Sequence, residues 1–369
     1  MRVLFQSRST LFSVPGGDTI QLTSTAESLR SLGVRVDIST DLTPPLEGYD
    51  LVHLFNLMRP QEVYLQAVNA KRQGRRVALS TIYGLYTEYE RKARPGLPGF
   101  VSRHVSPWQV ERLKVVARVI TNGEIGYGSL LVAGLGYKNL CGRVAEMTDV
   151  FLPNSNSEMQ RVHADFGQSR GKPFVVVPNA VNDKIFDPGK VIVPNSLRCF
   201  EGCAISAARI EGRKCQLDLV RAVKDLDVDL ILIGNPAPNH TAYFDAIKRE
   251  ANSRIHFVPQ VTHIELAQYY AAAKVHALVS WMETPGLSSL EAGAMGCNLV
   301  ITEKGDTRDY FGDDAYYCDP ESIDSIRSAL SAALSAPANP QLQARIRSEY
   351  TWEKAAQMTL KGYHLAFRE

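Results

Sequence analysis

The feature that most constrains the fold is an alternation of short apolar strands with helices, which runs through the chain twice. The first run opens with a strand at Val3–Phe5, a glycine turn at residues 15–18 and a helix that Thr19 can cap, which continues to about Leu32. Further strands are predicted at Val34–Ile38, Leu51–Leu54, Val77–Thr81, Asp149–Leu152 and Phe174–Val177, and further helices at Gln61–Gln73 and Ser157–Phe166. Strands that alternate with helices form a parallel sheet that is covered on both faces.

The second run follows a segment rich in Pro, Asn and Asp at residues 179–194, which is typical of a linker. Its predicted strands are Cys203–Ala207, Leu230–Ile233, His256–Val258, Val275–Val279 and Asn298–Thr302, and its predicted helices are Gln216–Lys224, Tyr243–Asn252, Ile264–Ala273 and Ser288–Met295. We therefore predict an α/β protein with two doubly wound parallel-sheet domains, at residues 1–178 and 195–350. A final amphipathic helix at residues 352–369 is expected to pack back on the first domain.

Composition limits the class of protein. With 369 residues, of which 45% are hydrophobic and 22% charged, the chain is long enough for two cores and is not mainly disordered. No run approaches the ~18 apolar residues that cross a bilayer, and the polar residues 7–10 come too soon for a signal peptide. The six cysteines lack Cys-x-x-Cys spacing, which predicts reduced thiols, no structural zinc and a cytoplasmic location.

The net charge of +2 is divided unevenly along the chain. Residues 1–178 hold 21 Lys and Arg against 15 Asp and Glu, a net charge of +6, and the remainder holds 20 against 24, a net charge of −4. A basic half suits an anionic partner, such as lipid headgroups, a lipid-linked diphosphate or nucleic acid, although uneven surface charge also occurs without a partner. The sequence contains no recognisable basic, aromatic-rich nucleic-acid module.

Two segments do not follow the alternation. Residues 94–101 hold too much Pro and Gly for a regular element, which favours either a mobile loop at a site or an ordinary surface connection. Residues 122–142 are glycine-rich and apolar, and their pattern favours no particular element.

The first of these segments belongs to a stretch that mixes cations with apolar side chains: Arg91, Lys92, Arg94, Leu97, Phe100, Val101 and Trp108. A second basic group lies at residues 71–76. Apolar groups that enter the interface and cations that meet anionic lipid are what a peripheral membrane contact needs. We therefore expect a peripheral contact with the inner face of an anionic membrane; the alternative is that residues 71–76 merely end a helix and residues 97–100 only cover a site.

The most informative stretch for chemistry is residues 280–294. A predicted strand ends just before it, a Pro-Gly turn follows, and a helix starts near Leu287. The amides of Gly286, Leu287 and Ser288 would then point out of a helix N-terminus, where partial positive charge favours a phosphate group.

Two glutamates flank this helix start. Glu283 lies in the turn and Glu291 in the second helical turn, so both can face one ligand. Carboxylates suit the hydroxyl groups of a sugar better than the oxygens of a phosphate, because they accept hydrogen bonds and do not donate them. The alternative is that Glu283 is a solvated loop residue and Glu291 a partner of the helix dipole.

A basic loop at Arg209–Lys214 directly follows the predicted strand Cys203–Ala207. Loops at the carboxyl ends of parallel strands are where doubly wound sheets bind ligands. Arg209 can hold a diphosphate through its bidentate guanidinium and Lys214 through its point charge. Taken alone, the loop is equally typical of a solvated basic turn.

Together these elements resemble the retaining family 4 glycosyltransferases of the GT-B fold, over nearly the whole chain. Five features stand in that family's order: glycines 16 and 17, Asp-Leu-Val-His at 50–53, Val-Pro-Asn-Ala-Val at 177–181, Arg209 and Lys214 at Arg-x4-Lys spacing, and Glu283 and Glu291 eight residues apart. Ala180 replaces a glycine of the family pattern. One such feature is a weak signal, and five in order are a strong one.

The resemblance implies two Rossmann-like domains that face a central cleft, with the acceptor on the first and a nucleotide-diphospho-sugar on the second. It implies that Arg209 and Lys214 stabilise the departing diphosphate, that Glu283 holds sugar hydroxyls and that Glu291 holds the nucleotide ribose. Attack on the face of the leaving group would retain the anomeric configuration. The resemblance implies no metal ion and no other cofactor.

Further positions follow from the same resemblance. Gly17 would approach the phosphates or the acceptor, and Gly234 would line the donor pocket. The nucleotide base would lie near Val261–His263. GDP-using relatives often place a carboxylate there, which His263 does not supply, so UDP is slightly favoured over GDP.

One departure concerns a histidine that relatives often carry after the fourth strand. Here Tyr83 is expected to occupy that place on the acceptor side, and a phenol is a poor base because its ordinary pKa is ~10. His104 is expected to face either the acceptor or solvent. His53 is expected in the core or behind the site.

The leading hypothesis is therefore hexosyl transfer to a glycan or lipid-linked acceptor, in the synthesis of a surface polysaccharide or another glycoconjugate. The alternative, which the departure at Tyr83 supports, is a catalytically degenerate protein that binds nucleotide-sugars or serves as a scaffold. An NAD-dependent oxidoreductase is disfavoured, because Gly234-Asn235-Pro236 is not a dinucleotide fingerprint. Asp227-Val228-Asp229 resembles a metal-binding Asp-x-Asp pair but precedes a strand, and we expect it to be an ordinary loop.

Overall fold

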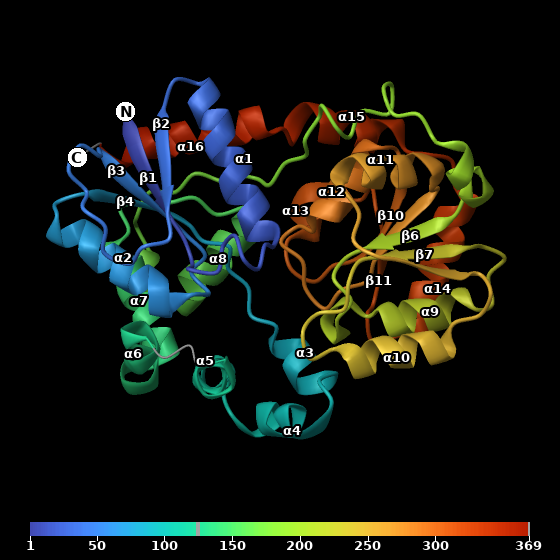
Figure 1. Cartoon of the computed structure of the whole chain (residues 1–369), viewed down its shortest axis with the longest axis horizontal. Coiled ribbons are helices and arrows are strands. Elements are labelled where there is room, and N and C mark those ends of the chain that lie inside the picture. The colour runs from blue at the N-terminus through green and yellow to red at the C-terminus, as the bar shows by residue number, and fades with distance from the viewer. Residues whose placement is uncertain (123–125, 368–369) are drawn as a thin grey trace. The chain divides into compact units, whose positions relative to one another are not determined.

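The chain forms two compact units, each built on one parallel sheet (Figure 1). The computed structural model describes residues 1–122 and 126–367. The first unit comprises Met1–Arg91, Pro95–Asn179 and the C-terminal segment from Trp352, and the second comprises Lys92–Arg94 and Ala180–Thr351. Two parallel α/β sheets are the architecture that the alternation of strands and helices predicts.

The sheet of the first unit has five parallel strands in the order β2-β1-β3-β4-β5. They are β1 (Arg2–Gln6), β2 (Arg35–Ser39), β3 (Leu51–Phe55), β4 (Arg76–Ser80) and β5 (Val150–Phe151). The central strand β3 is buried along its whole length, as expected for a parallel strand covered on both faces. The expected strand at 174–177 is reduced to a single bridge between Phe174 and Phe151.

Helices cover both faces of this sheet (Figure 1). The helices of the first unit are α1 (Gly17–Ser31), α2 (Pro60–Arg72), α3 (Thr87–Lys92), α4 (Gly96–His104), α5 (Pro107–Asn122), α6 (Tyr127–Leu135), α7 (Tyr137–Met147), α8 (Asn156–Asp165) and α16 (Trp352–Ala366). Helix α16 packs against α1 on one face, and α2 and α7 pack together on the other. The C-terminal helix is thus part of the first unit.

The connection from β4 to β5 contains α3 to α7, although one helix is enough to join two parallel strands. The expectation that residues 94–101 form no regular element is wrong, because α4 begins at Gly96. Its Pro98 lies in the first helical turn, where the missing amide has no intrahelical partner to lose. Residues 122–142 are largely helical as well, with Gly136 at a φ of +87° between α6 and α7; residues 123–125 of that stretch lie outside the described residues.

The sheet of the second unit has six parallel strands in the order β11-β10-β9-β6-β7-β8. They are β6 (Ala204–Ala207), β7 (Leu230–Ile233), β8 (Ile255–Val258), β9 (Val275–Leu278), β10 (Asn298–Thr302) and β11 (Tyr316–Cys318). The short edge strand β11 was not expected from the sequence. The helices are α9 (Gln216–Val223), α10 (Thr241–Glu250), α11 (His263–Ala272), α12 (Leu287–Ala294), α13 (Thr307–Phe311), α14 (Ile323–Ser335) and α15 (Pro340–Glu349).

Within residues 1–122 and 126–367, the helices are all too short or too polar to cross a membrane.

Candidate active site

The candidate donor site is built from loops of the second unit that follow β6, β7, β9 and β10. These four strands are neighbours in the sheet, in the order β10-β9-β6-β7. Because they are parallel, their carboxyl ends lie at one edge, and the loops that follow them converge there. That edge is where an open α/β sheet binds its ligands.

The loops after β6 and β9 are joined by an ion pair between Lys214 and Glu283. Lys214 ends a single 3-10 turn at Gly212–Lys214, and its Nζ contacts Oε1 of Glu283. The two side chains are only 16% and 9% exposed, so bulk water screens their attraction poorly. The amide of Trp281 also donates to the carbonyl oxygen of Arg213 at 3.0 Å. The structure therefore brings two of the predicted catalytic residues into direct contact.

Arg209 lies in the same loop as Lys214 and is exposed at its start. The path of this loop depends on Gly234, which follows β7 and has a φ of +143°. A Cβ atom at Gly234 would come 2.2 Å from the carbonyl oxygen of Ala208. The amide of Ile210 donates to the carbonyl oxygen of Asn235 at 3.0 Å, which fixes the backbone next to Arg209. Gly234 thus positions the basic loop, whatever further contact it makes with a ligand.

The backbone of Glu283 is held by the loop after β10. Its amide donates to the carbonyl oxygen of Lys304 at 3.1 Å, and its carbonyl oxygen accepts from the amide of Asp306 at 2.9 Å. Gly305, between these two residues, has a φ of +94°, and a Cβ atom there would lie 2.1 Å from the carbonyl oxygen of Glu283. The sequence analysis did not identify Gly305 as part of the site. Its position directly after a parallel strand was the feature that could have indicated it.

Helix α12 begins beside the carboxylate of Glu283. Gly286 is its N-cap, with a φ of +88°, and a Cβ atom there would lie 3.4 Å from Oε2 of Glu283. Leu287 and Ser288 are the first two helical residues, whose amides have no acceptor within the helix. The predicted helix start, its free amides and the Lys214–Glu283 pair are therefore parts of one cluster. Such a cluster can hold a phosphate group and the hydroxyls of a sugar attached to it.

Glu291 lies in the second turn of α12 and is 7% exposed. Its burial raises its pKa to about 8, because the interior disfavours the charged form. Near neutral pH this carboxyl group is mostly protonated in the free protein. A ligand hydroxyl that donates to it would favour its ionised form.

The remaining predicted donor residue, Val261, precedes α11. It is half-buried and packs against the core of the second unit. The helix starts with a capping box in which Thr262 and Glu265 bind each other's backbone amides. The ring of the neighbouring His263 lies 6.0 Å from that of Phe186, and burial lowers the pKa of His263, so this histidine is neutral near pH 7.

In the first unit, the glycine turn leads into α1, which begins at Gly17 with Gly16 as its N-cap. The turn is organised by Arg8, which sequence reasoning missed. Arg8 is 5% exposed, binds Asp18 at 2.7 Å and donates to the carbonyl oxygen of Val14 at 2.9 Å. Burial alone would raise the pKa of Asp18, but the hydrogen bond and charge of Arg8 lower it overall.

Tyr83 is a buried residue, although the sequence led us to expect it on the acceptor side of the site. Its side chain is buried, its hydroxyl group donates to Asp165 at 2.7 Å, and its ring packs against Phe166. Burial and the carboxylate of Asp165 raise the pKa of Tyr83 well above its ordinary value. Tyr83 lies beyond the end of β4, and its amide donates to Oε1 of Glu158 at 2.7 Å. It cannot replace an exposed histidine.

The two histidines of the first unit that were considered for the site differ in their burial. His53 is fully buried on β3, with its ring nitrogens 2.7 Å from Tyr363 Oη and 2.9 Å from Ser80 Oγ. It is a core residue. His104 is exposed in the last turn of α4, and its Nδ1 lies 2.8 Å from the carbonyl oxygen of Phe100.

The Asp-x-Asp sequence at residues 227–229 is a surface loop, as expected. Asp227 forms an ion pair with Arg254, and Asp229 lies 2.7 Å from the ring of His256. Both carboxylates precede β7 and lie at the opposite end of that strand from Gly234.

Comparison with known proteins agrees with this geometry. Residues 201–351 match the family described as glycosyl transferases group 1. The D-inositol 3-phosphate glycosyltransferase of Corynebacterium urealyticum is 24% identical over 94% of this chain and 90% of its own length.

Two solved structures share the whole fold. Sucrose-phosphate synthase from Thermosynechococcus elongatus has a TM-score of 0.72 and 16% identity over 100% of this chain and 99% of its own. The Anabaena protein HepE, solved with UDP-glucose, has a TM-score of 0.66 and 15% identity over 99% of each chain. The paired parallel sheets and the family match lead to one conclusion: residues 201–351 form a group 1 glycosyltransferase domain, and the whole chain has the GT-B fold of the solved glycosyltransferases.

Proposed function

We propose that the chain transfers a hexose from a UDP-sugar, with retention of configuration, to a hydroxyl group of a glycan or lipid-linked acceptor. The match of residues 201–351 to that family supports the coarser statement, that the chain transfers a sugar from a nucleotide-sugar donor. The choice of UDP, the class of acceptor and a role in surface polysaccharide or glycoconjugate synthesis in the cytoplasm are our proposal.

The observation that carries the proposal is the Lys214–Glu283 pair beside the N-terminus of α12. In the free protein, the charge of Lys214 is balanced by Glu283. A donor diphosphate would take Lys214, Arg209 and the helix amides as partners. Glu283 would then be released to accept hydrogen bonds from the sugar. Lys214 would thus exchange its pair with Glu283 for one with the diphosphate. Glu283 would receive hydrogen bonds from the sugar instead, so that neither charge is left buried without a partner.

In the proposed reaction the acceptor oxygen forms a bond to the anomeric carbon on the face from which the diphosphate leaves. The bond from that carbon to the phosphate oxygen breaks, and the acceptor proton passes to a phosphate oxygen of the leaving UDP. Arg209 and Lys214 stabilise the charge that develops there, which is often the largest catalytic effect. This route needs no protein base, which agrees with the burial of Tyr83.

Two observations support UDP as the nucleotide. HepE was solved with UDP-glucose, and His263, neutral near pH 7, stands where GDP-using relatives often place a carboxylate. A thermal-shift panel of UDP, GDP and ADP tests the choice, because a ligand at ~100 times its Kd stabilises by ~2.7 kcal/mol. We expect UDP to raise Tm most. A shift with GDP alone would contradict the assignment of the base.

Transfer is expected to continue without a divalent metal ion, because Arg209, Lys214 and the start of α12 supply the positive charge at the diphosphate. Turnover of the UDP-sugar in excess EDTA should equal turnover without it. Loss of activity in EDTA and its recovery with Mn²⁺ or Mg²⁺ would show that the cationic loop is not sufficient.

The second candidate function is a binding protein without turnover. It is favoured by the hydrogen bond from Tyr83 to Asp165, which leaves no exposed acid or base from this residue at the place of the family's histidine. Slow hydrolysis of a UDP-sugar by the purified protein separates the two candidates. Binding of UDP without any hydrolysis or transfer would favour the second.

A further inference from the structure

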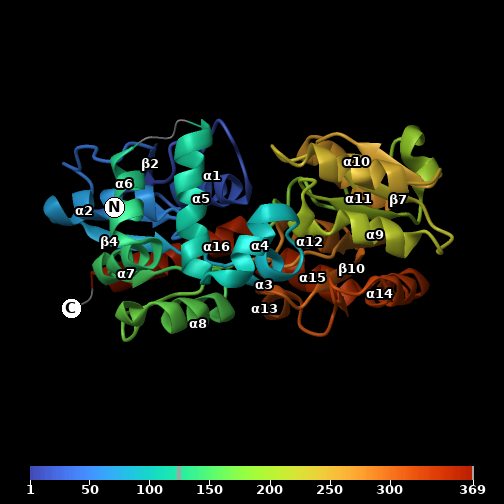
Figure 2. The same cartoon turned by 90° about the horizontal axis from the view of Figure 1, so that it is seen from below.

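Helices α4, α5 and α6 of the first unit carry large apolar side chains on their solvent side. Six such side chains are between 41 and 74% exposed: Leu97, Phe100, Leu113, Tyr127, Leu130 and Leu135. Helix α5 lies between α4 and α6 in both views (Figures 1 and 2). We call these six residues the α4–α6 surface. Exposed apolar residues that gather on neighbouring helices are a mark of an interaction surface.

The outward face of α6 follows from how the inner face is packed. Gly128 lies directly on α2, and a Cβ atom there would come 1.8 Å from the carbonyl oxygen of Gln61. Val132, one turn further on, is fully buried. The helix holds no charged residue and is apolar on both faces, so Tyr127 and Leu130 are left on the side that no described element covers, and Leu135 is exposed at the end of the helix.

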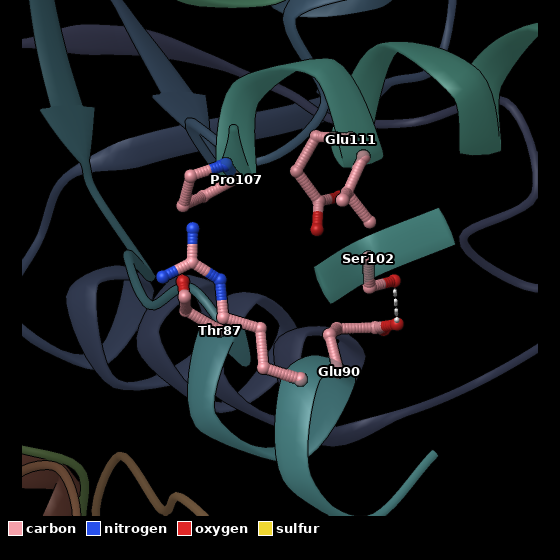
Figure 3. A pocket seen from close by; sticks show the side chains of 7 residues that line it. Thr87, Glu90, Ser102, Pro107 and Glu111 are labelled. Carbon is pink, nitrogen blue, oxygen red and sulfur yellow. Dashed lines mark hydrogen bonds between the residues drawn. The ribbon is translucent and has the colours of Figure 1, made fainter. Parts of the chain in front are cut away.

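The surface rests on a platform held by buried charges. Lys114 on α5 binds Glu90 of α3 at 2.8 Å and Glu111 at 2.7 Å, and both carboxylates are buried. Figure 3 shows Glu90, Ser102 and Glu111 converging from α3, α4 and α5 around a small pocket. Arg112 of α5 also donates to the carbonyl oxygen of Ala133 on α6. These contacts hold α4, α5 and α6 together, so the exposed apolar side chains lie on a packed group of helices.

The charge around this surface is positive. Among the described residues of α4 to α7, the exposed cations are Arg103, Arg112, Lys138 and Arg143, and the exposed acid is Glu146. Two copies of the chain joined through this face would bring these cations together, because a two-fold interface places each patch against itself. An anionic bilayer accepts both components, since its headgroups bind cations and its interior takes up apolar side chains.

We propose that the α4–α6 surface is a peripheral anchor that holds the first unit on an anionic lipid bilayer. The inference extends the proposed function, because a lipid-linked acceptor would be met at such a surface. The anchor differs from the one expected from the sequence. Trp108 packs against the core beside Phe166, Arg91 lines the pocket of Figure 3, and Lys92 and Arg94 belong to the second unit.

Vesicle flotation tests the anchor. The full chain is mixed with vesicles of phosphatidylcholine alone or with increasing phosphatidylglycerol, at low and high salt. We expect it to float with anionic vesicles at low salt only. Each cation of a basic surface adds about a fivefold gain in partitioning, so Arg103→Gln with Arg143→Gln should weaken binding by about 25-fold. Leu130→Asp should weaken it by at least about tenfold.

The matched control is Ile264→Asp in the second unit. Ile264 is 66% exposed and Leu130 is 62% exposed, so the two changes place the same charge at equally open positions. The control should float like the wild type. Thermal unfolding shows that each variant is folded, and UDP-sugar hydrolysis, whose proposed residues lie in the second unit, should be unchanged in the variants of the first unit. Failure of the anchor and failure of the proposed function are thereby distinguished.

Three results would overturn the anchor: wild-type protein that stays in solution at every phosphatidylglycerol content, equal loss of binding in Ile264→Asp, or flotation that does not depend on lipid charge. Sedimentation of the protein alone identifies the other occupant. A dimer that Leu130→Asp converts to a monomer, without vesicle binding by the wild type, would assign the surface to a second copy of the chain.

Discussion

At the scale of single residues, the contact between Lys214 and Glu283 sets the resting state of the donor site. Each side chain would be costly to bury alone, and each satisfies the other until a ligand arrives. The two residues are proposed to have separate roles with the donor, so their effects on stability and on turnover can be measured independently.

Lys214→Ala is expected to lower kcat by roughly 10²–10³-fold, as does removal of other preorganised groups that stabilise a transition state. It should also lower the free energy of unfolding, because Glu283 loses its cation, although by less than the about 3–5 kcal/mol typical of a fully buried pair. The double variant with Glu283→Gln should regain stability but not activity. Steady-state kinetics and thermal unfolding report the two effects. Wild-type turnover in Lys214→Ala would remove the residue from the site.

Glu291 gives the site a pH dependence. Its pKa of about 8 lies above its unfolded value of ~4.3, so the folded state binds the proton more tightly, and this contribution to stability is lost as pH rises through about 8. If ribose hydroxyls donate to the carboxylate, UDP binding releases a proton near pH 7 and tightens as pH rises. Calorimetry in buffers of different ionisation enthalpy measures this release. Glu291→Gln should abolish it; release that persists in this variant would point to another group.

The sequence predicted the polar residues of the site better than the residues that support them. Lys214 and Glu283 stood out because the spacings of Arg209 to Lys214 and of Glu283 to Glu291 resemble a family pattern. Arg8 and Gly305 did not stand out, because they act on backbone that is brought near only by the fold. The burial of Tyr83 was not visible in the sequence, because it depends on contacts with Asp165 and Phe166, which lie far along the chain.

At the scale of elements, the donor site depends on turns that follow parallel strands. The loops after β7 and β10 carry no predicted catalytic side chain. They contribute Gly234 and Gly305, whose missing Cβ atoms allow the neighbouring loops to approach. The bounds of β6, β7, β9 and β10 were predicted to within about a residue, since buried parallel strands are continuous apolar runs.

Gly305→Ala tests this dependence. Its φ of +94° would be strained for alanine, and the added Cβ atom would meet the carbonyl oxygen of Glu283. Gly202, with a φ of +83° and open space around its Cβ position, is the matched control in the same unit. Gly202→Ala should cost about 1–2 kcal/mol and leave UDP binding unchanged. Gly305→Ala should cost more and should weaken UDP binding, as measured by thermal shift. Equal effects would mean that the loop after β10 does not position Glu283.

The elements that sequence reasoning misjudged belong mainly to the insertion between β4 and β5. Proline and glycine in α4 and α6 suggested irregular chain, yet Pro98 lies in the first turn of its helix and Gly128 is required by contact with α2. Neither reason is visible without the neighbouring element. The apolar character of α6 was visible, but a helix that is apolar on both faces has no periodicity by which to recognise it.

At the scale of the whole molecule, the chain does not complete its two units in order. The residues of the donor site lie in the second unit, whereas α16 returns to the first unit. There Tyr363 contacts His53 of β3, and Gly362 lies so close to β5 that a Cβ atom would meet Leu152 at 2.4 Å.

Tyr363→Phe is expected to separate stability from donor binding. It removes the hydroxyl group 2.7 Å from His53 Nδ1 and leaves a buried nitrogen without its partner, which should cost about 1–3 kcal/mol. The Kd of UDP should not change, because the residues proposed to bind it lie in the second unit. Calorimetric unfolding and titration with UDP measure the two quantities. A weakened Kd would show that the units are coupled in binding.

The return of α16 also has a consequence for synthesis on the ribosome. The five strands of the first sheet emerge before residue 180, but the helix that covers β4 and β5 is not made until residues 180–351 have followed. At ~5–20 residues per second, that interval lasts roughly 10–30 s. For this time His53 and Leu152 lack their final cover, and an open apolar sheet is prone to aggregate. The nascent chain, rather than the finished enzyme, is therefore the form most in need of a chaperone.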